Sequence, residues 1–298
     1  MATAHSSLNA KAQLLHSYHS GSTLVLPNAW DAASAALFAE AGAKAVATTS
    51  GGVSWALGRP DGQGLSRTEM LAMAERIASV VDVPVTADIE GGYGPSAHDV
   101  AETVRAAVAA GVVGINLEDS GAADSTLFGV EAQAERISAA REAAAQVGVQ
   151  DLLINARTDV FLFEVGAASE RFDEVVSRAK AYAEAGADCL FVPGLVSLPV
   201  LKLLVAASPL PVNAMTGPGG PGVAELAAAG VQRISVGTAM AEIAYTAARA
   251  AARELLAEDG DVKDGEPKDA DSTGGESGTA DTKDADPLTY FDLNGLFV

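Results

Sequence analysis

Four carboxylate side chains stand in short polar motifs where they could act together on a metal ion. Asp61 follows a proline, Asp88 and Glu90 flank an isoleucine, and Glu118 comes directly after an apolar run. Carboxylates that converge without counter-charges repel each other and raise one another's pKa values. A hard divalent cation relieves that repulsion, and Mg²⁺ prefers oxygen ligands while keeping several waters. The four residues therefore predict a site for Mg²⁺, with Mn²⁺ as an alternative, although acidic pairs of this kind can instead cap the next helix.

Groups that could hold an anionic substrate lie in other motifs. Arg157 offers a bidentate donor for a carboxylate or phosphoryl group. The backbone N–H groups of Ser50-Gly51-Gly52 could hold another anionic oxygen, because glycine permits a close approach. We take Asp61 as the candidate for proton handling or water positioning, and Asp61, Arg157 and Glu118 as candidate catalytic residues. The simpler interpretation of Arg157 is an ion pair with Asp159 or Glu118.

Short apolar runs alternate with Ala-rich helical segments along most of the chain. The runs are continuous rather than alternating in polarity, which is typical of parallel strands covered by helices. Eight strand–helix units in succession favour a closed (β/α)8 TIM barrel, an α/β fold, over an open doubly wound sheet. The predicted strands are 24–26, 45–48, 85–87, 114–117, 152–155, 189–192, 211–213 and 233–236, and the predicted helices are 31–41, 68–80, 97–110, 131–147, 167–185, 197–207, 222–229 and 239–257.

A barrel of this kind has its active site at the C-terminal ends of the strands. Trp30, Asn116 and Asn213 also fall at such ends, and we take them as candidate substrate-binding residues. Glycine-containing segments at 216–220 and 237–238 follow the last two predicted strands, where many barrels bind phosphate. Two alternatives stay open: a phosphate-binding isomerase or synthase that uses these loops, and a non-catalytic protein that binds a metabolite.

Composition and charge favour a cytoplasmic enzyme with a small-molecule substrate. Hydrophobic residues make up 49% of the 298 residues, and the net charge is −20. Such acidity disfavours nucleic acid and anionic membranes as partners. The apolar runs are far shorter than the ~20 residues of a membrane span, and no signal peptide is visible. The single cysteine, Cys189, excludes an internal disulfide.

Four segments follow from these patterns. We expect an N-terminal helical extension at 1–22, the catalytic barrel at 23–257, an acidic disordered insertion at 258–286 and a C-terminal docking segment at 287–298. The insertion is rich in Asp, Glu, Gly, Ser and Thr, and it cannot bury enough apolar surface to offset the entropy of ordering. Aromatic and aliphatic residues return after it, which predicts that the last segment packs on a barrel.

Taken together, the motifs resemble the isocitrate lyase/phosphoenolpyruvate mutase superfamily over roughly residues 20–257. The resemblance implies a barrel whose eighth helix is exchanged between subunits of a homo-oligomer, usually a tetramer. It implies Mg²⁺ near Asp88, with Asp61, Glu90 and Glu118 holding its waters. It also implies that Ser50, Gly51 and Gly52 bind a substrate carboxylate and that Arg157 contacts the reacting end. The motifs are Pro27-Asn28-Ala29-Trp30-Asp31, Thr49-Ser50-Gly51-Gly52, Pro60-Asp61, 87–94, Asn116-Leu117-Glu118-Asp119 and 155–159.

The resemblance further implies an enzyme that makes or breaks a C–C or P–C bond beside a 2-oxo or enolate group, as mutases of phosphoenolpyruvate and hydrolases of phosphonopyruvate or oxaloacetate do. Two departures limit it. The usual Asp-x-Asp is Asp88-Ile89-Glu90 here, and residues 119–129 contain no Cys, Lys or His. Lyases of isocitrate and methylisocitrate carry their catalytic cysteine in that loop, and the Lys- and Asn-containing gating loop of phosphoenolpyruvate mutases is not evident either. We therefore expect a small carboxylate or phosphonate substrate other than isocitrate.

Overall fold

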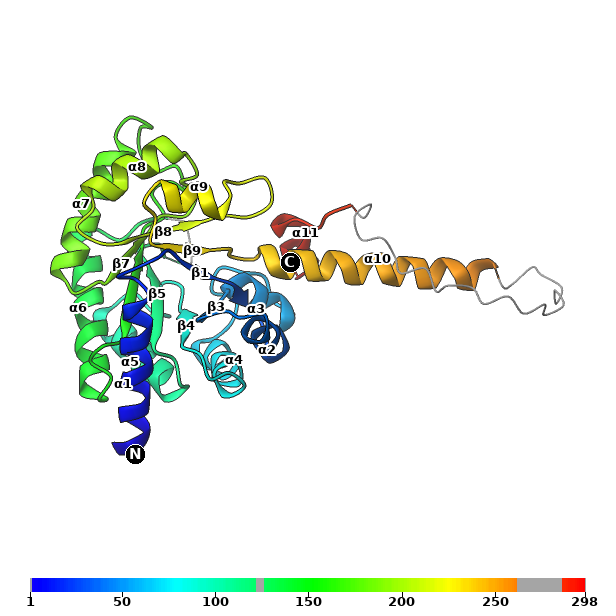
Figure 1. Cartoon of the computed structure of the whole chain (residues 1–298), viewed down its shortest axis with the longest axis horizontal. Helices are drawn as coiled ribbons and strands as arrows, with labels where there is room; N and C mark the ends of the chain where they lie inside the picture. Colours follow the sequence, from blue (N-terminus) through cyan, green and yellow to red (C-terminus); the bar gives the residue numbers. More distant parts are fainter. Residues whose placement is uncertain (1, 122–125, 262–285, 298) are drawn as a thin grey trace.

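The computed structural model describes residues 2–121, 126–261 and 286–297. Within them, parallel strands alternate with helices and wind into the predicted (β/α)8 barrel (Figure 1). The strands run side by side in the order β1-β9-β8-β7-β6-β5-β4-β3-β2. They are β1 (Leu24–Leu26), β2 (Asn28–Ala29), β3 (Val46–Thr48), β4 (Val85–Asp88), β5 (Gly114–Glu118), β6 (Leu153–Arg157), β7 (Cys189–Phe191), β8 (Val212–Met215) and β9 (Arg233–Ser235).

The barrel closes through one extended stretch of chain that contributes both β1 and β2. β1 pairs in parallel with β9, and β2 pairs in parallel with β3. Pro27 separates the two short strands, and proline has no backbone N–H to donate to a ladder. β1 is the predicted strand 24–26, and β2, which the sequence prediction did not include, follows it after Pro27, so the described residues form nine strands where eight were predicted.

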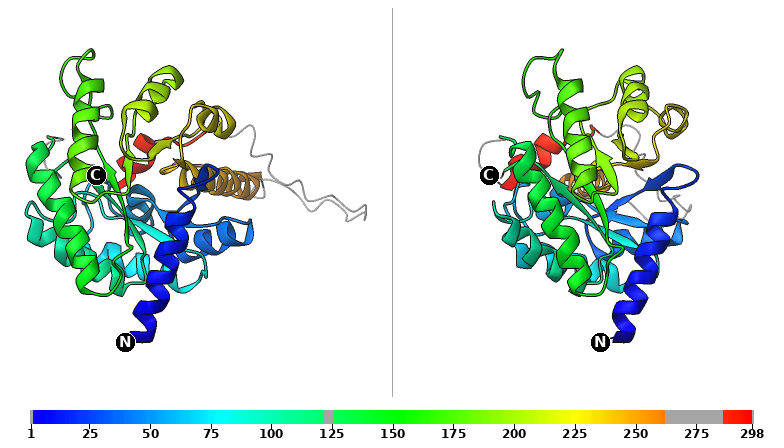
Figure 2. Two further views of the ribbon diagram at one scale, coloured as in Figure 1. Left: turned by 60° about the vertical axis from the view of Figure 1, so that its left-hand side comes forward. Right: turned by 90° about the vertical axis from the view of Figure 1, so that its left-hand side faces the viewer.

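Each of the eight predicted helices has a counterpart in the structure, and most of them lie on the outside of the sheet. Figure 2 shows α5, α6 and α7 side by side along one flank. Capping boxes at Asp31, Ser66 and Ser96 fix the starts of α2, α4 and α5. The barrel helices are α2 (Ala32–Glu40), α4 (Arg67–Ser79), α5 (Ala97–Ala109), α6 (Val130–Gln146), α7 (Arg171–Glu184), α8 (Leu198–Ala207), α9 (Val223–Ala228) and α10 (Ala239–Asp261).

Three further helical segments lie outside this repeat. α1 (Ala2–Ser17) lies within the N-terminal extension expected at 1–22, and it packs at the N-terminal ends of the central strands. Its Leu15 packs so close to Gly114 at the start of β5 that a Cβ there would lie 2.9 Å from Leu15 Cδ2. The others are α3 (Ser50–Ala56) and, at the C-terminus, α11 (Tyr290–Asn294) with the 3₁₀ turn η2 (Gly295–Phe297).

Several boundaries differ from the sequence prediction. The helix expected from 167 begins at Arg171, and α10 continues to Asp261 rather than ending at 257. Residues 262–285, which make up most of the predicted acidic insertion, lie outside the described residues. In the described part of the chain, no helix is both long and apolar enough to cross a bilayer.

His19, just after α1, is a buried titratable group that links stability to pH. Its Nδ1 donates to the carbonyl of Leu15 at 2.9 Å, and its side chain lies among buried residues. Burial, and then the charge of Arg233, lower the pKa of His19 to about 4. The unfolded chain takes up a proton near pH 6.5, before the folded protein does. The contribution to stability is therefore complete above pH 6.5 and is lost as the pH falls toward 4.

We expect this group to remove about 3 kcal/mol of unfolding free energy between pH 7 and pH 4. His19→Asn keeps a donor for the Leu15 carbonyl but does not titrate. Urea unfolding of both proteins at pH 7, 5.5 and 4.5 should show the wild type losing its advantage as the pH falls. Parallel pH profiles for the two proteins would contradict the prediction.

Candidate active site

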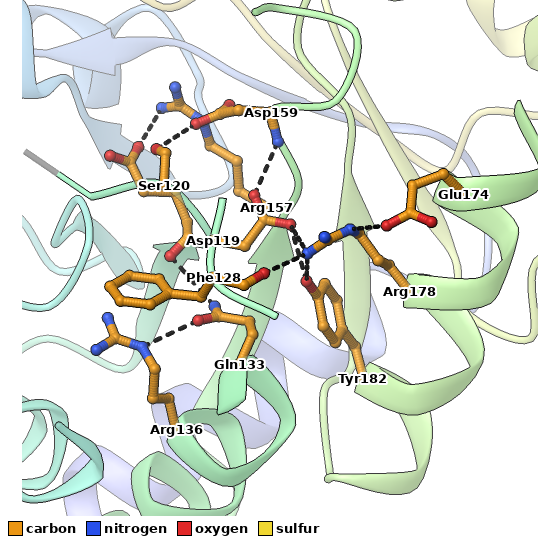
Figure 3. Close-up of polar contacts among 11 residues, drawn as sticks. Asp119, Ser120, Phe128, Gln133, Arg136, Arg157, Asp159, Glu174, Arg178 and Tyr182 are labelled. Atoms are coloured by element: carbon orange, nitrogen blue, oxygen red, sulfur yellow. Dashed lines mark hydrogen bonds and ion pairs between the residues drawn. The ribbon is translucent and has the colours of Figure 1, made fainter. Parts of the chain in front are cut away.

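Strands β4, β5 and β6 bring three predicted site residues together at their carboxyl ends. Asp88 pairs in register with Asn116, and Glu118 pairs with Arg157. Arg157 Nη1 lies 2.8 Å from Glu118 Oε2. Its Nε donates to Asp159 Oδ1 at 2.6 Å, and Figure 3 labels Arg157 and Asp159. Burial lowers the pKa of Arg157, but the surrounding carboxylates outweigh burial and raise it well above its usual value. Arg157 is thus both the expected cation of the site and the ion-pair partner of its neighbours.

The carboxylates of the site are more numerous than its cations. Burial raises the pKa of Asp88, and Arg157 opposes that shift. Burial, followed by the charges of Asp61 and Asp88, raises the pKa of Glu90 to about 8. Burial also raises the pKa of Glu118 well above its usual value, again opposed by Arg157. This excess of buried acidic groups is the arrangement that an added cation would stabilise.

Glu90 is held by donors from its own loop. Its backbone is left-handed, with φ 49°. Glu90 Oε1 accepts a hydrogen bond from the Tyr93 hydroxyl at 2.9 Å, and Oε2 accepts one from the backbone N–H of Gln63. Asp88 Oδ1 accepts from the Glu90 N–H at 3.2 Å. Both carboxylate oxygens of Glu90 therefore already have protein donors.

The donor set fits a hydrated Mg²⁺ better than a site formed by direct ligation alone. Among the described residues, no three His, Cys, Asp or Glu side chains lie close enough to hold a metal ion between them. The acidic groups nevertheless offer only oxygen, and Asp61 Oδ1 is buried without a hydrogen-bond partner. Mg²⁺ is commonly held by one or two carboxylates while it keeps several waters. Asp88 would hold the cation, and Asp61, Glu90 and Glu118 would hold its waters.

Ser50, Gly51 and Gly52 form the first turn of α3, where the sequence suggested only a loop. The N–H groups of a first helical turn have no partner inside the helix. A Cβ on Gly51 would lie 3.1 Å from Asp61 Oδ2, and a Cβ on Gly52 would lie 2.8 Å from Trp30 Cβ. Both positions therefore require glycine, and Gly51 faces the Asp61 carboxylate. Ser50 also opposes the rise in the pKa of Asp88 that burial causes.

The other predicted binding residues lie deeper in the barrel or behind this turn. Asn155 Nδ2 donates to Asn116 Oδ1 at 2.8 Å and to Asn213 Oδ1 at 3.0 Å. This buried layer also receives Arg233, whose Nη2 lies 3.2 Å from Asn116 Oδ1. Trp30 packs its ring against Phe38 and Tyr245 rather than against the carboxylates. Asn155 thus bridges Asn116 and Asn213, and Trp30 lies behind Gly52.

A family model described as phosphoenolpyruvate phosphomutase matches residues 14–256. The chain belongs to the phosphoenolpyruvate phosphomutase family. It is thereby a member of the isocitrate lyase/phosphoenolpyruvate mutase superfamily, as its motifs indicate, and members of that superfamily are lyases and mutases.

Individual relatives agree with this assignment. An uncharacterized protein of Mycobacterium tuberculosis (strain H37Rv) is 35% identical over 238 residues, which are 80% of this chain and 86% of that protein. The 2-methylisocitrate lyase of Escherichia coli K12 is 32% identical over 188 residues, 60% of each chain. A crystal structure from Burkholderia cenocepacia J2315 is 44% identical, with a TM-score of 0.76, and the match covers 85% of this chain and 99% of that one.

In this member of the phosphoenolpyruvate phosphomutase family, helices α6 and α7 anchor the loops of the site through residues that the sequence did not single out. Asp119 Oδ2 accepts hydrogen bonds from Arg178 Nη1 at 2.9 Å and from the Tyr182 hydroxyl at 2.8 Å (Figure 3). Asp119 Oδ1 accepts from the Asp159 N–H at 3.0 Å. Asp159, in turn, binds Arg157. A buried chain of contacts thus runs from α7 to the candidate catalytic arginine.

A second buried arginine joins α6 to the loop after β4. Arg136 Nη1 donates to the Gly94 carbonyl at 2.8 Å, its Nη2 donates to the Gly91 carbonyl, and its Nε donates to Gln133 Oε1 at 3.0 Å. Its guanidinium lies 4.2 Å from the centre of the Phe128 ring (Figure 3). Burial lowers the pKa of Arg136 to about 10. Arg136 therefore fixes the Gly-rich loop that carries Glu90.

Two residues of the C-terminal segment also reach the site. The Tyr290 hydroxyl donates to Asp61 Oδ2 at 3.2 Å, and Asn294 Oδ1 accepts from the Asp61 N–H at 2.7 Å. Sequence patterns predicted that this segment docks on a barrel, but they gave no signal for these contacts with Asp61.

Proposed function

We propose that the protein is a Mg²⁺-dependent lyase, mutase or hydrolase that makes or breaks a C–C or P–C bond in a small 2-oxo or phospho-carboxylate, through an enolate-like intermediate. The observation that carries the proposal is the convergence of Asp88, Glu118 and Arg157 at one barrel mouth. Family membership supports the reaction class. The identity of the substrate is left to experiment.

Each group of the site has its own role in this proposal. The free N–H groups of Ser50-Gly51-Gly52 would bind a substrate carboxylate. Arg157, which Glu118 and Asp159 orient, would contact the reacting end and stabilise negative charge that develops there. When bound, the divalent cation would supply further positive charge opposite the enolate-like oxygen. Asp61 lies beside Gly51 and would hold a proton or position a water at the reacting atoms.

The loops after β8 and β9 are a weaker basis for function. A phosphate site there would need free donors, but the Thr216 hydroxyl donates to the Pro221 carbonyl at 2.6 Å. The Thr238 hydroxyl donates to Glu242 Oε1 at 2.6 Å. Both hydroxyls are thus occupied within their own segments, which favours the site around Asp88 over a phosphate-binding isomerase or synthase.

A substrate panel, assayed with Mg²⁺ and with a chelator, tests the proposal. We expect Mg²⁺-dependent turnover of at least one 2-oxo dicarboxylate or phosphonate, such as oxaloacetate or phosphonopyruvate. We expect isocitrate and 2-methylisocitrate to be turned over more slowly than ~1 s⁻¹, because residues 119–129 hold no Cys, Lys or His to act as the acid. Rapid cleavage of either would refute the specificity. If nothing on the panel reacts, the non-catalytic alternative is favoured.

We also propose that the protein is a homo-oligomer in which α10 packs on a neighbouring barrel. α10 projects from the barrel (Figure 1), and Ile243, Leu255 and Leu256 on it are 56%, 69% and 70% exposed. A groove of 560 Å³ beside its start is lined by apolar residues that include Val25 and Phe38. An exposed apolar helix next to an apolar groove is typical of an interface between subunits.

Sedimentation equilibrium tests the oligomer. The wild type should sediment as a dimer or tetramer. Ile243→Asp should shift it toward the monomer, because a charge would replace an apolar side chain that the neighbouring subunit covers in the oligomer. Glu254→Gln on the same helix should leave the mass unchanged. A monomeric wild-type protein would overturn this proposal.

A further inference from the structure

The C-terminal segment 286–297 lies on the same side of the barrel as the candidate site. In both figures of the whole chain, α11 lies beside the first part of α10 (Figures 1 and 2). Leu288 and Leu293 of this segment are buried against Trp55 of α3 and Ala241 of α10. The Tyr290 ring also packs on Trp55, with ring centres 5.5 Å apart. Apolar contacts therefore account for much of the docking of this segment.

Two polar side chains of the segment are directed at one residue, Asp61. Asn294 Oδ1 accepts from the Asp61 N–H at 2.7 Å and from Trp55 Nε1 at 3.1 Å. The Tyr290 hydroxyl donates to Asp61 Oδ2 at 3.2 Å. Asn294 thus fixes the backbone of Asp61, and Tyr290 fixes its carboxylate, across sequence separations of 233 and 229 residues.

These contacts orient Asp61 toward the substrate-binding turn. The Asp61 carboxylate lies next to Gly51, and its charge contributes to the raised pKa of Glu90 and of Asp88. Its second oxygen, Oδ1, is buried and has no hydrogen-bond partner among the described residues. Burial, and then the Asp61 charge, raise the pKa of Tyr290, so its hydroxyl stays protonated and remains a donor. Tyr290 therefore holds one oxygen and leaves the other for the reaction.

We propose that Tyr290 and Asn294 are positioning residues of the active site, which hold the Asp61 carboxylate in the orientation in which it acts on the substrate. The inference rests on the proposed function of Asp61. The ring contact with Trp55 does not require the Tyr290 hydroxyl, because phenylalanine at 290 would make the same contact. The loop that carries Asp61 is a turn outside any helix or strand, and these two hydrogen bonds hold Asp61 itself within it.

The test compares three single variants of the full-length protein on the substrate found by the panel. Tyr290→Phe and Asn294→Ala should lower kcat by about 10-fold, the worth of a lost hydrogen bond to a charged or buried group, with little change in KM. Leu296→Ala changes a residue of the same segment that is 69% exposed, and it should match the wild type. In an Asp61→Ala background, Tyr290→Phe should cause no further loss, because the carboxylate that the Tyr290 hydroxyl contacts is already absent.

The outcomes separate the inference from the proposed function. Two results with a reacting substrate would overturn the inference. In the first, Tyr290→Phe keeps the wild-type kcat; in the second, Tyr290→Phe lowers kcat by the same factor whether or not Asp61 is present. If nothing on the panel reacts, the proposed function fails, and the inference is judged by hydrogen exchange at the Asp61 amide. Exchange at that amide should be about 10-fold faster in Asn294→Ala than in Leu296→Ala if the bond forms, and equal rates would overturn the inference.

Discussion

Asp88→Asn is expected to lower kcat/KM by about 10³-fold, the largest functional effect that we predict. The substitution keeps the shape of the side chain but removes the charge that β4 places beside Arg157 and the first turn of α3. Loss of metal binding removes several kcal/mol of charge stabilisation in the transition state, and about 4 kcal/mol corresponds to the stated factor. Steady-state kinetics with saturating Mg²⁺ measure it.

Asp88→Asn should affect the stability of the protein differently from its activity. Burial raises the pKa of Asp88, which means that the charged form of this side chain is unfavourable in the folded protein. In the variant, Arg157 still has Glu118 and Asp159 as ion-pair partners. The thermal midpoint should therefore be unchanged or raised. Asp82→Asn, an exposed carboxylate just before the same strand, is the matched control and should keep full activity. Wild-type turnover by Asp88→Asn, or by chelated wild-type protein, would refute the metal-dependent mechanism.

The barrel and the centre of the site could be read from the sequence because they depend on local patterns. Continuous apolar runs gave the strands, and parallel strands of one barrel place their carboxyl ends together. Asp88, Glu118 and Arg157 needed no more than this rule to be neighbours. The rule does not say which of these side chains pair with each other at the mouth of the barrel. The sequence indicated Asp159 or Glu118 as the partner of Arg157, and that Arg157 pairs with both depends on side-chain geometry that no spacing encodes.

The features that the sequence did not reveal depend on tertiary contacts. Ser50-Gly51-Gly52 has weak helix propensity, yet α3 forms because the barrel packs around it and leaves room only for glycine. Tyr290 and Asn294 reach Asp61 from the far end of the chain, and no periodicity links such distant positions.

Arg178→Met is expected to lower the free energy of unfolding by 3–5 kcal/mol, roughly the cost of breaking a buried ion pair on one side. Asp119 is fully buried, and the Arg178 side chain is 7% exposed. Burial raises the pKa of Asp119, and Arg178 opposes that shift. Removal of the guanidinium also takes away the donor to the Phe128 carbonyl, at 3.0 Å, in the loop after β5. Chemical denaturation measures the loss.

Two further variants show whether the loss comes from the unpaired charge. Adding Asp119→Asn to Arg178→Met should recover part of the stability, because no buried carboxylate is then left without its cation. Glu174→Gln removes the other partner of Arg178, but that side chain is 41% exposed, so about 1 kcal/mol or less should be lost. Because Asp119 binds the Asp159 N–H and Asp159 binds Arg157, Arg178→Met should also weaken substrate binding and raise KM. An Arg178→Met protein as stable as Glu174→Gln would show that the buried chain from α7 to Arg157 does not support the site.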